Sequence, residues 1–143
     1  MPKINESELK KEIKSGDFKN AYLLYGEESY LKEYYASELK NKIVDKTFEA
    51  FNFHYFDGKD TELDDILKDA QMLPMMSEYN FVMVKDYPIE KSANDIKLLE
   101  EYLKDAPDTT VFVFWFDAIE PDVKSAKFKK VIKAFEKAGD CVE

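Results

Sequence analysis

The pattern of apolar and polar positions along the chain alternates between two periods. Apolar residues at every third or fourth position predict helices, and short, almost wholly apolar runs predict buried strands. The predicted helices cover 6–15, 28–45, 61–72, 92–104 and 122–138, and the predicted strands cover 21–25, 51–56, 80–87 and 109–117, with another strand starting at 140. Because these elements alternate and the strands are apolar on both faces, we expect a doubly wound α/β fold. Its mainly parallel five-stranded sheet should carry helices on both faces.

Residues at the helix ends support these boundaries. Gly16 and Gly139 follow the last turns of two helices, where glycine commonly ends a helix. Ser92 is expected to cap the helix that follows it, and Thr61 resembles the start of a capping box.

Length and composition indicate one domain over residues 1–143. A chain of 143 residues with 45% hydrophobic residues can bury a sizeable core. The chain stops inside an expected strand, so we expect a domain from a longer protein. One cysteine, Cys141, and the lack of an apolar signal or membrane segment predict a cytoplasmic protein.

The charge pattern counts against nucleic-acid binding. The net charge is −9 and all 21 basic residues are lysines, so no arginine is available for a bidentate phosphate or guanine contact. One predicted helix, 122–138, is rich in lysine above an apolar stripe. These lysines form either a solvated helix face or a weak nucleic-acid contact. They are Lys124, Lys127, Lys129, Lys130, Lys133 and Lys137.

The carboxyl end of the first apolar strand is where an α/β protein often binds phosphate. A nucleotide-binding loop needs a glycine-rich segment ending in Gly-Lys-Ser or Gly-Lys-Thr. Here Gly26 is followed by Glu27 and Glu28, which would repel a triphosphate and suit the helix dipole instead. The sequence therefore predicts a degenerate phosphate site with no cofactor.

Two other strand ends carry aspartates, Asp86 and Asp117. Together they could hold magnesium, as in a receiver-like signalling domain, or each could start a turn or cap a helix. His54 has no second histidine or cysteine nearby, so we expect a structural role for it. Cys141 has no base nearby in the sequence and is expected to be inert, and we find no catalytic set.

The turn at residues 71–76, "QMLPMM", is apolar where polar residues are usual. Pro74 cannot continue the preceding helix and moves Leu73 out of helical geometry. Met75 and Met76 then lie before the strand at 80–87. They either fill the core beneath the turn or form an exposed anchor for a partner.

Three segments together resemble the N-terminal domain of the delta subunit of the bacterial DNA polymerase III clamp loader. "AYLLYGEESYLKEYY" resembles the opening of that family, at a P-loop position that has lost its phosphate-binding residues. "DGKDTELDDILKDAQMLPMMSEYNFVMVKD" resembles its helix, turn and strand, and "KDAPDTTVFVFWFD" resembles its next strand. Their order and spacing cover nearly the whole chain.

The resemblance implies an AAA+-like domain that neither binds nor hydrolyses ATP. It implies that the domain binds the sliding clamp, the beta subunit, and helps to open the ring during DNA replication. The other clamp-loader subunits would be contacted through C-terminal domains outside this chain, and DNA only in the full complex, with no membrane. The full-length protein would be a subunit of the polymerase holoenzyme. The clamp-binding element implied by the resemblance comprises Gln71, Leu73, Pro74, Met75 and Met76.

Overall fold

The computed structural model describes residues 3–4, 6–16, 18–26, 29–119 and 121–142. Within them, six parallel strands form one sheet in the order β1-β6-β2-β5-β4-β3. The strands are β1 (Lys3–Ile4), β2 (Ala21–Leu24), β3 (Phe53–Asp57), β4 (Asn80–Lys85), β5 (Thr110–Trp115) and β6 (Asp140–Val142). The helices are α1 (Glu6–Ser15), α2 (Ser29–Ile43), α3 (Glu49–Asn52), α4 (Leu63–Ala70), α5 (Ala93–Lys104) and α6 (Ala126–Ala138), with 3-10 turns η1 (Lys46–Phe48) and η2 (Ile89–Lys91).

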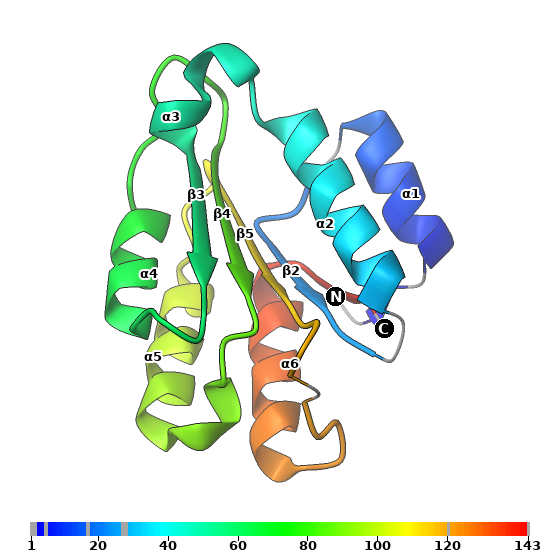
Figure 1. The fold of residues 1–143 in the computed structure, drawn as a ribbon, viewed down its shortest axis with the longest axis vertical. Helices are drawn as coiled ribbons and strands as arrows, with labels where there is room; N and C mark the ends of the chain where they lie inside the picture. The colour runs from blue at the N-terminus through cyan, green and yellow to red at the C-terminus, as the bar shows by residue number, and fades with distance from the viewer. Residues whose placement is uncertain (1–2, 5, 17, 27–28, 120, 143) are drawn as a thin grey trace.

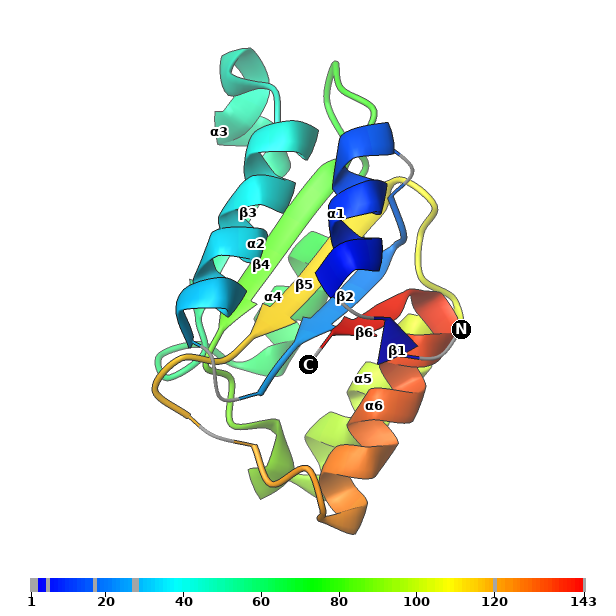
Figure 2. The same cartoon turned by 90° about the vertical axis from the view of Figure 1, so that its right-hand side faces the viewer.

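The helices cover both faces of the sheet, as a parallel sheet requires. α4, α5 and α6 lie on one face, and α1 and α2 lie on the other (Figures 1 and 2). The central strands β2, β4 and β5 are buried almost throughout, because helices cover both of their faces. The doubly wound α/β fold predicted from the sequence is therefore confirmed.

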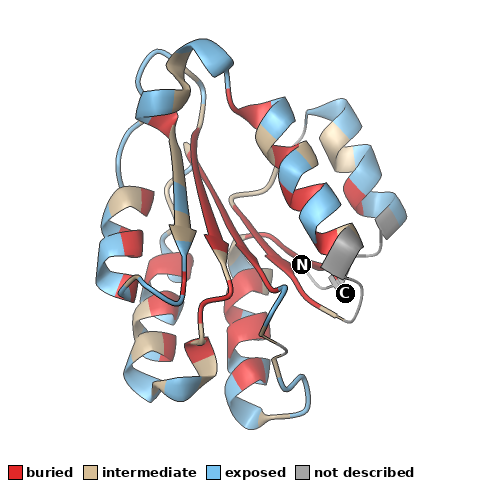
Figure 3. Ribbon diagram, viewed as in Figure 1, coloured by how far each residue is buried: buried red, intermediate tan, exposed pale blue. Residues whose placement is uncertain are grey.

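Each face of the sheet has its own apolar core. Under α4, α5 and α6, the rings of Phe112, Phe114 and Phe135 pack with centroids 5.1–6.1 Å apart. Under α1 and α2, the core contains Leu39 and Trp115 among others. Figure 3 shows the buried strands between helices whose outer faces are exposed. None of the helices in the described residues combines the length and apolar composition that crossing a bilayer requires.

The structure differs from the sequence-based expectation at several boundaries. The two-residue strand β1 was not expected, and it adds a sixth strand to the sheet by pairing with β6. The strand expected at 51–56 begins at Phe53, because residues 49–52 form the helical turn α3.

Two helix starts also differ from the expected ones. The capping-box assignment of Thr61 is wrong: its hydroxyl donates to the carbonyl of Asp57 at 3.0 Å, and α4 begins at Leu63. α6 begins at Ala126 rather than near 122, because the Ser125 hydroxyl accepts a hydrogen bond from the amide of Phe128 at 3.0 Å. The cap predicted at Ser92 is confirmed, since its hydroxyl accepts from the amide of Asp95.

Gly139 ends α6 and lets β6 approach β2. A Cβ atom at this position would lie 1.8 Å from the carbonyl oxygen of Ala21. A larger residue would therefore push β6 away from its neighbour in the sheet.

The parallel arrangement gives the sheet two different rims. The position after β2, where a phosphate loop would lie, is at the carboxyl ends of the strands. The loop between α4 and β4 lies at the opposite rim, where the strands begin (Figure 1). The two candidate sites predicted from the sequence are thus on opposite sides of the domain.

Candidate functional site

The loop between α4 and β4 exposes a cluster of apolar side chains. Half of the large apolar residues that are exposed in the described part of the chain fall within positions 72–76. Leu73 is 77% exposed, Met76 80%, Met75 55% and Met72 47%. Most of this loop is pale blue in Figure 3. These side chains therefore do not fill the core beneath the turn, and they are available to contact another molecule.

Three side chains bind the last turn of α4 and so hold the start of this loop in place. The carbonyl of Ala70 accepts hydrogen bonds from the Thr110 hydroxyl at 2.9 Å and the Tyr102 hydroxyl at 3.2 Å. The Asn80 side chain donates to the carbonyl of Asp69 at 2.9 Å. Side chains from α5, β4 and β5 thus satisfy carbonyls that a helix end leaves without partners.

The middle of the loop is held by a buried side chain on α3. The Asn52 carboxamide donates to the carbonyl of Met75 at 2.8 Å and accepts from its amide at 2.7 Å. Met76, the next residue, has a φ of +55°, a backbone conformation that residues other than glycine seldom adopt. The backbone is therefore fixed in an uncommon conformation while the side chains remain exposed.

The structure places all five predicted site residues on this one segment. Gln71 forms the C-cap of α4, is exposed, and lines a shallow groove between α4 and α5. Pro74 lies between the two most exposed apolar side chains of the loop. Two residues of the site were missed: Met72, which the apolar character of the turn already indicated, and Asn52. Nothing in the sequence pairs Asn52 with a residue 23 positions later.

At the degenerate phosphate site, a lysine side chain binds the backbone of the turn. The side chain of Lys32, 6% exposed, folds back and donates from Nζ to the carbonyl of Gly26 at 2.7 Å. Gly26 itself has a φ of +115°. Glu27 and Glu28 lie outside the described residues. The first lysine that follows this strand end in the sequence is therefore bound to the backbone of the turn.

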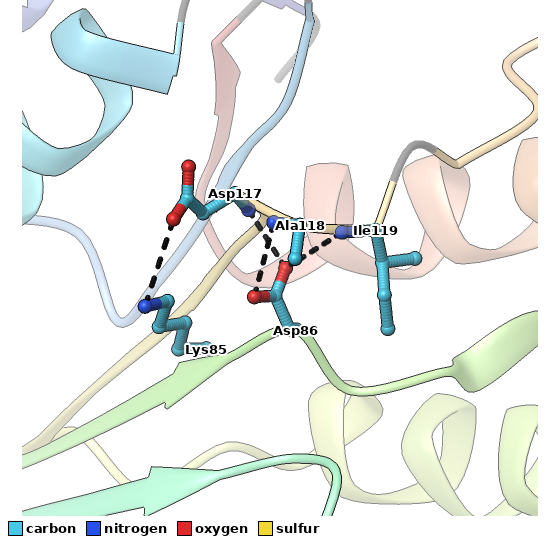
Figure 4. A network of polar contacts seen from close by, with 5 residues as sticks. All are labelled: Lys85, Asp86, Asp117, Ala118 and Ile119. Carbon is cyan, nitrogen blue, oxygen red and sulfur yellow. Dashed lines mark hydrogen bonds and ion pairs between the residues drawn. The ribbon is translucent and has the colours of Figure 1, made fainter.

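Asp86 organises the turn after β5 (Figure 4). Its buried carboxylate accepts backbone hydrogen bonds from Asp117 at 2.7 Å, Ile119 at 3.1 Å and Ala118 at 3.2 Å. Burial alone would raise the pKa of Asp86, but these three amides bring that pKa below its usual value. Asp86 thus has a structural role rather than a metal-binding one, but the turn that it caps follows β5 and is not the turn that Asp86 itself starts.

The paired-aspartate magnesium site does not form. The carboxylate of Asp117 faces Lys85, with its Oδ2 atom 3.6 Å from Nζ. Within the described residues, no group of three His, Cys, Asp or Glu side chains is placed to hold a metal ion. The receiver-like alternative therefore has no support in this geometry.

Two of the remaining candidates, His54 and Cys141, make contacts within the fold. His54 lies with Nδ1 3.4 Å from Asp69 Oδ2, linking β3 to α4. Cys141 is fully buried and its thiol contacts the carbonyl of Ile132 at 3.4 Å. The lysines of the last helix are exposed, while Phe128 and its apolar neighbours face the core. Exposed lysines fit both a solvated helix face and a weak nucleic-acid contact, so the choice between the two stays a prediction.

Comparison with known proteins identifies the family to which the chain is similar. The profile of the family described as "DNA polymerase III, delta subunit" matches residues 22–143. The DNA polymerase III subunit delta of Bacillus subtilis is 32% identical over 134 residues, which is 89% of this chain and 38% of the relative. The chain thus spans about two fifths of the length of that relative.

Solved structures give the same result. The structure of the Bacillus subtilis DNA clamp loader delta protein superposes with a TM-score of 0.78 at 27% identity, covering 96% of this chain and 41% of the other. A gamma subunit-related DNA polymerase III protein of Thermotoga maritima, 17% identical, shares the fold with a TM-score of 0.63, covering 94% of this chain and 45% of the other. Because the family profile spans most of the chain, the chain belongs to the DNA polymerase III delta subunit family.

Proposed function

We propose that this chain is the clamp-binding module of a clamp-loader delta subunit. In this proposal, Gln71, Leu73, Pro74, Met75 and Met76 form the element that enters an apolar pocket on the sliding clamp. The observation that carries the proposal is the exposed apolar cluster at 72–76 on a backbone held by the fold. Family membership supports it independently.

The chemistry of the loop suits a partner with a preformed pocket. Binding hot spots are apolar or aromatic side chains that become fully desolvated at the centre of an interface. Methionine is unbranched and polarisable, so Met75 and Met76 can adapt to the shape of such a pocket. Leu73 adds a more rigid apolar group on the same segment.

Clamp opening would follow from differential binding. A module that binds a ring can open it only if it binds the open form more tightly than the closed form. A loop fixed on a rigid sheet supplies such selectivity better than a flexible one, because it presents its side chains in one arrangement.

The rest of the proposal concerns the whole protein. Other clamp-loader subunits would be contacted through domains outside this chain, and DNA would be contacted in the full complex, in the bacterial cytoplasm. The module would have no ATPase activity of its own, because the Gly-Lys-Ser/Thr segment is missing after Gly26.

A charge placed in the loop tests the proposal. Leu73→Glu should abolish measurable binding to a bacterial sliding clamp, because a carboxylate cannot enter an apolar pocket without a partner. Val123→Glu is the matched control, since Val123 is also exposed but precedes α6 at the opposite rim of the sheet. Equal clamp binding by both variants and the parent, measured by surface plasmon resonance, would overturn the proposal.

A further inference from the structure

Asn52 makes an unusual pair of contacts for a side chain on a four-residue helix. It is 2% exposed, and both ends of its carboxamide bind the backbone of one residue, Met75. An asparagine amide offers a donor and an acceptor, and here they satisfy the carbonyl and the amide of Met75 together. The side chain thus acts on the loop as a neighbouring strand would.

This contact is the main restraint on the centre of the loop. In the described part of the chain, residues 73–78 make no other hydrogen bonds to the fold. Asn80, Tyr102 and Thr110 hold the end of α4, before the exposed side chains begin. Removing the Asn52 amide would therefore free the loop while leaving the helix end in place.

The restraint also determines where the methionines point. Met76 follows the bonded residue directly and has a φ of +55°, which costs energy for a side chain of this size. A conformation of this kind persists only when its surroundings fix it. The two bonds to Met75 provide that fixation one residue away.

We propose that Asn52 is a positioning residue for partner binding: it holds Met75 and Met76 in the arrangement that the clamp accepts, without touching the clamp. This inference rests on the function proposed above. A loop that is already ordered loses less conformational entropy on binding, so the bound complex is more stable for the same contacts. Asn52 would thereby set the affinity of an interface of which it is not part.

The test is a double-mutant cycle in the full chain. Asn52→Leu keeps the approximate size of the side chain and removes both hydrogen bonds. It should weaken binding to the sliding clamp about ten-fold, on the scale of the ordering cost of a few side chains. In the background Met75→Ala/Met76→Ala, the same substitution should change affinity less than two-fold, on the order of the error of additivity, because the groups that it positions are absent.

Asn20→Leu is the matched control. Asn20 also donates two hydrogen bonds to backbone carbonyls, those of Asp108 before β5 and Thr110 in β5, rather than to residues 72–76. Its replacement should lower the melting temperature but leave clamp affinity unchanged. Hydrogen exchange of the Met75 amide should accelerate in Asn52→Leu and stay at the parental rate in Asn20→Leu.

The outcomes separate the two proposals. If Met75→Ala/Met76→Ala binds the clamp like the parent, the clamp-binding assignment itself fails. The positioning role is refuted if three results coincide: truncating the methionines weakens clamp binding, the Met75 amide exchanges faster in Asn52→Leu, and Asn52→Leu still binds the clamp with parental affinity. Should Asn52→Leu not fold, Asn52→Asp takes its place, because it keeps the acceptor for the Met75 amide and loses the donor. A folded Asn52→Asp with parental affinity would refute the role equally.

Discussion

Truncating the two loop methionines should affect binding far more than folding. Met75 is 55% and Met76 80% exposed, so together they have more than one full side chain left to bury in a partner. Burying a methionine side chain completely contributes about 1.5–3 kcal/mol. Met75→Ala with Met76→Ala should therefore weaken clamp binding by about 2–4 kcal/mol, roughly thirty-fold to a thousand-fold.

The same truncation should cost the domain about 1 kcal/mol or less, because exposed side chains leave no cavity behind. Met83 on β4 provides the matched control, since it is 6% exposed within the core. Met83→Ala should cost about 2–5 kcal/mol of stability and leave clamp affinity unchanged in the folded protein. Urea unfolding gives the stabilities, and calorimetric titration with the clamp at fixed salt gives the affinities.

One result would refute the reasoning. If the double variant lost as much stability as Met83→Ala while its folded fraction bound the clamp with parental affinity, the two methionines would belong to the core. The clamp-binding assignment at 71–76 would then be wrong.

Three further predictions concern other parts of the domain. Titration with Mg-ATP at millimolar concentration should show no saturable heat, since the phosphate-binding residues after Gly26 are missing; a micromolar dissociation constant would contradict this. Duplex DNA should not bind appreciably to the isolated domain at physiological salt. Tight binding that is lost when the α6 lysines are replaced by glutamate would instead show that this helix contacts nucleic acid. Burial, and after it the nearby side chain of Asp140, raises the pKa of Glu12 from 4.5 to about 7. Between these two pH values the folded state keeps a proton that the unfolded state releases, so stability should fall as pH rises from about 4.5 to about 7. The free energy of unfolding of Glu12→Gln should equal that of the parent near pH 4 and exceed it by about 1–2 kcal/mol near pH 8, a figure discounted for solvent screening. If urea unfolding gave the same difference between variant and parent at both pH values, the effect would be excluded.

The sequence predicted the larger elements because their apolar periods are strong. The strand at 109–117 is almost wholly apolar, and the helix over 61–72 places Leu63, Ile66 and Leu67 on one face, all buried in the structure. Such patterns report on burial directly, so the order and class of elements followed from them. The apolar turn was also visible in the sequence, since loops seldom contain so many apolar residues.

Other features depend on contacts between distant residues and leave little local signal. The sequence pattern assigns Asn52 to a strand, and only its hydrogen bonds to Met75 in the structure show its role. Asp86 could have been a metal ligand or a cap, and the amides that decide between these roles lie more than 30 residues later. The edge strand β1 has two residues, too few to show a period.

The strand order has a consequence for synthesis on the ribosome. β2 lies between β5 and β6, so Ala21 pairs with Phe112 and Tyr22 pairs with Asp140. The ribosome releases β2 long before either partner, whereas β3 and β4 emerge close together and can pair early. The apolar segment "AYLL" must therefore remain unpaired while most of the domain is translated, and the nascent chain exposes it to chaperones throughout that interval.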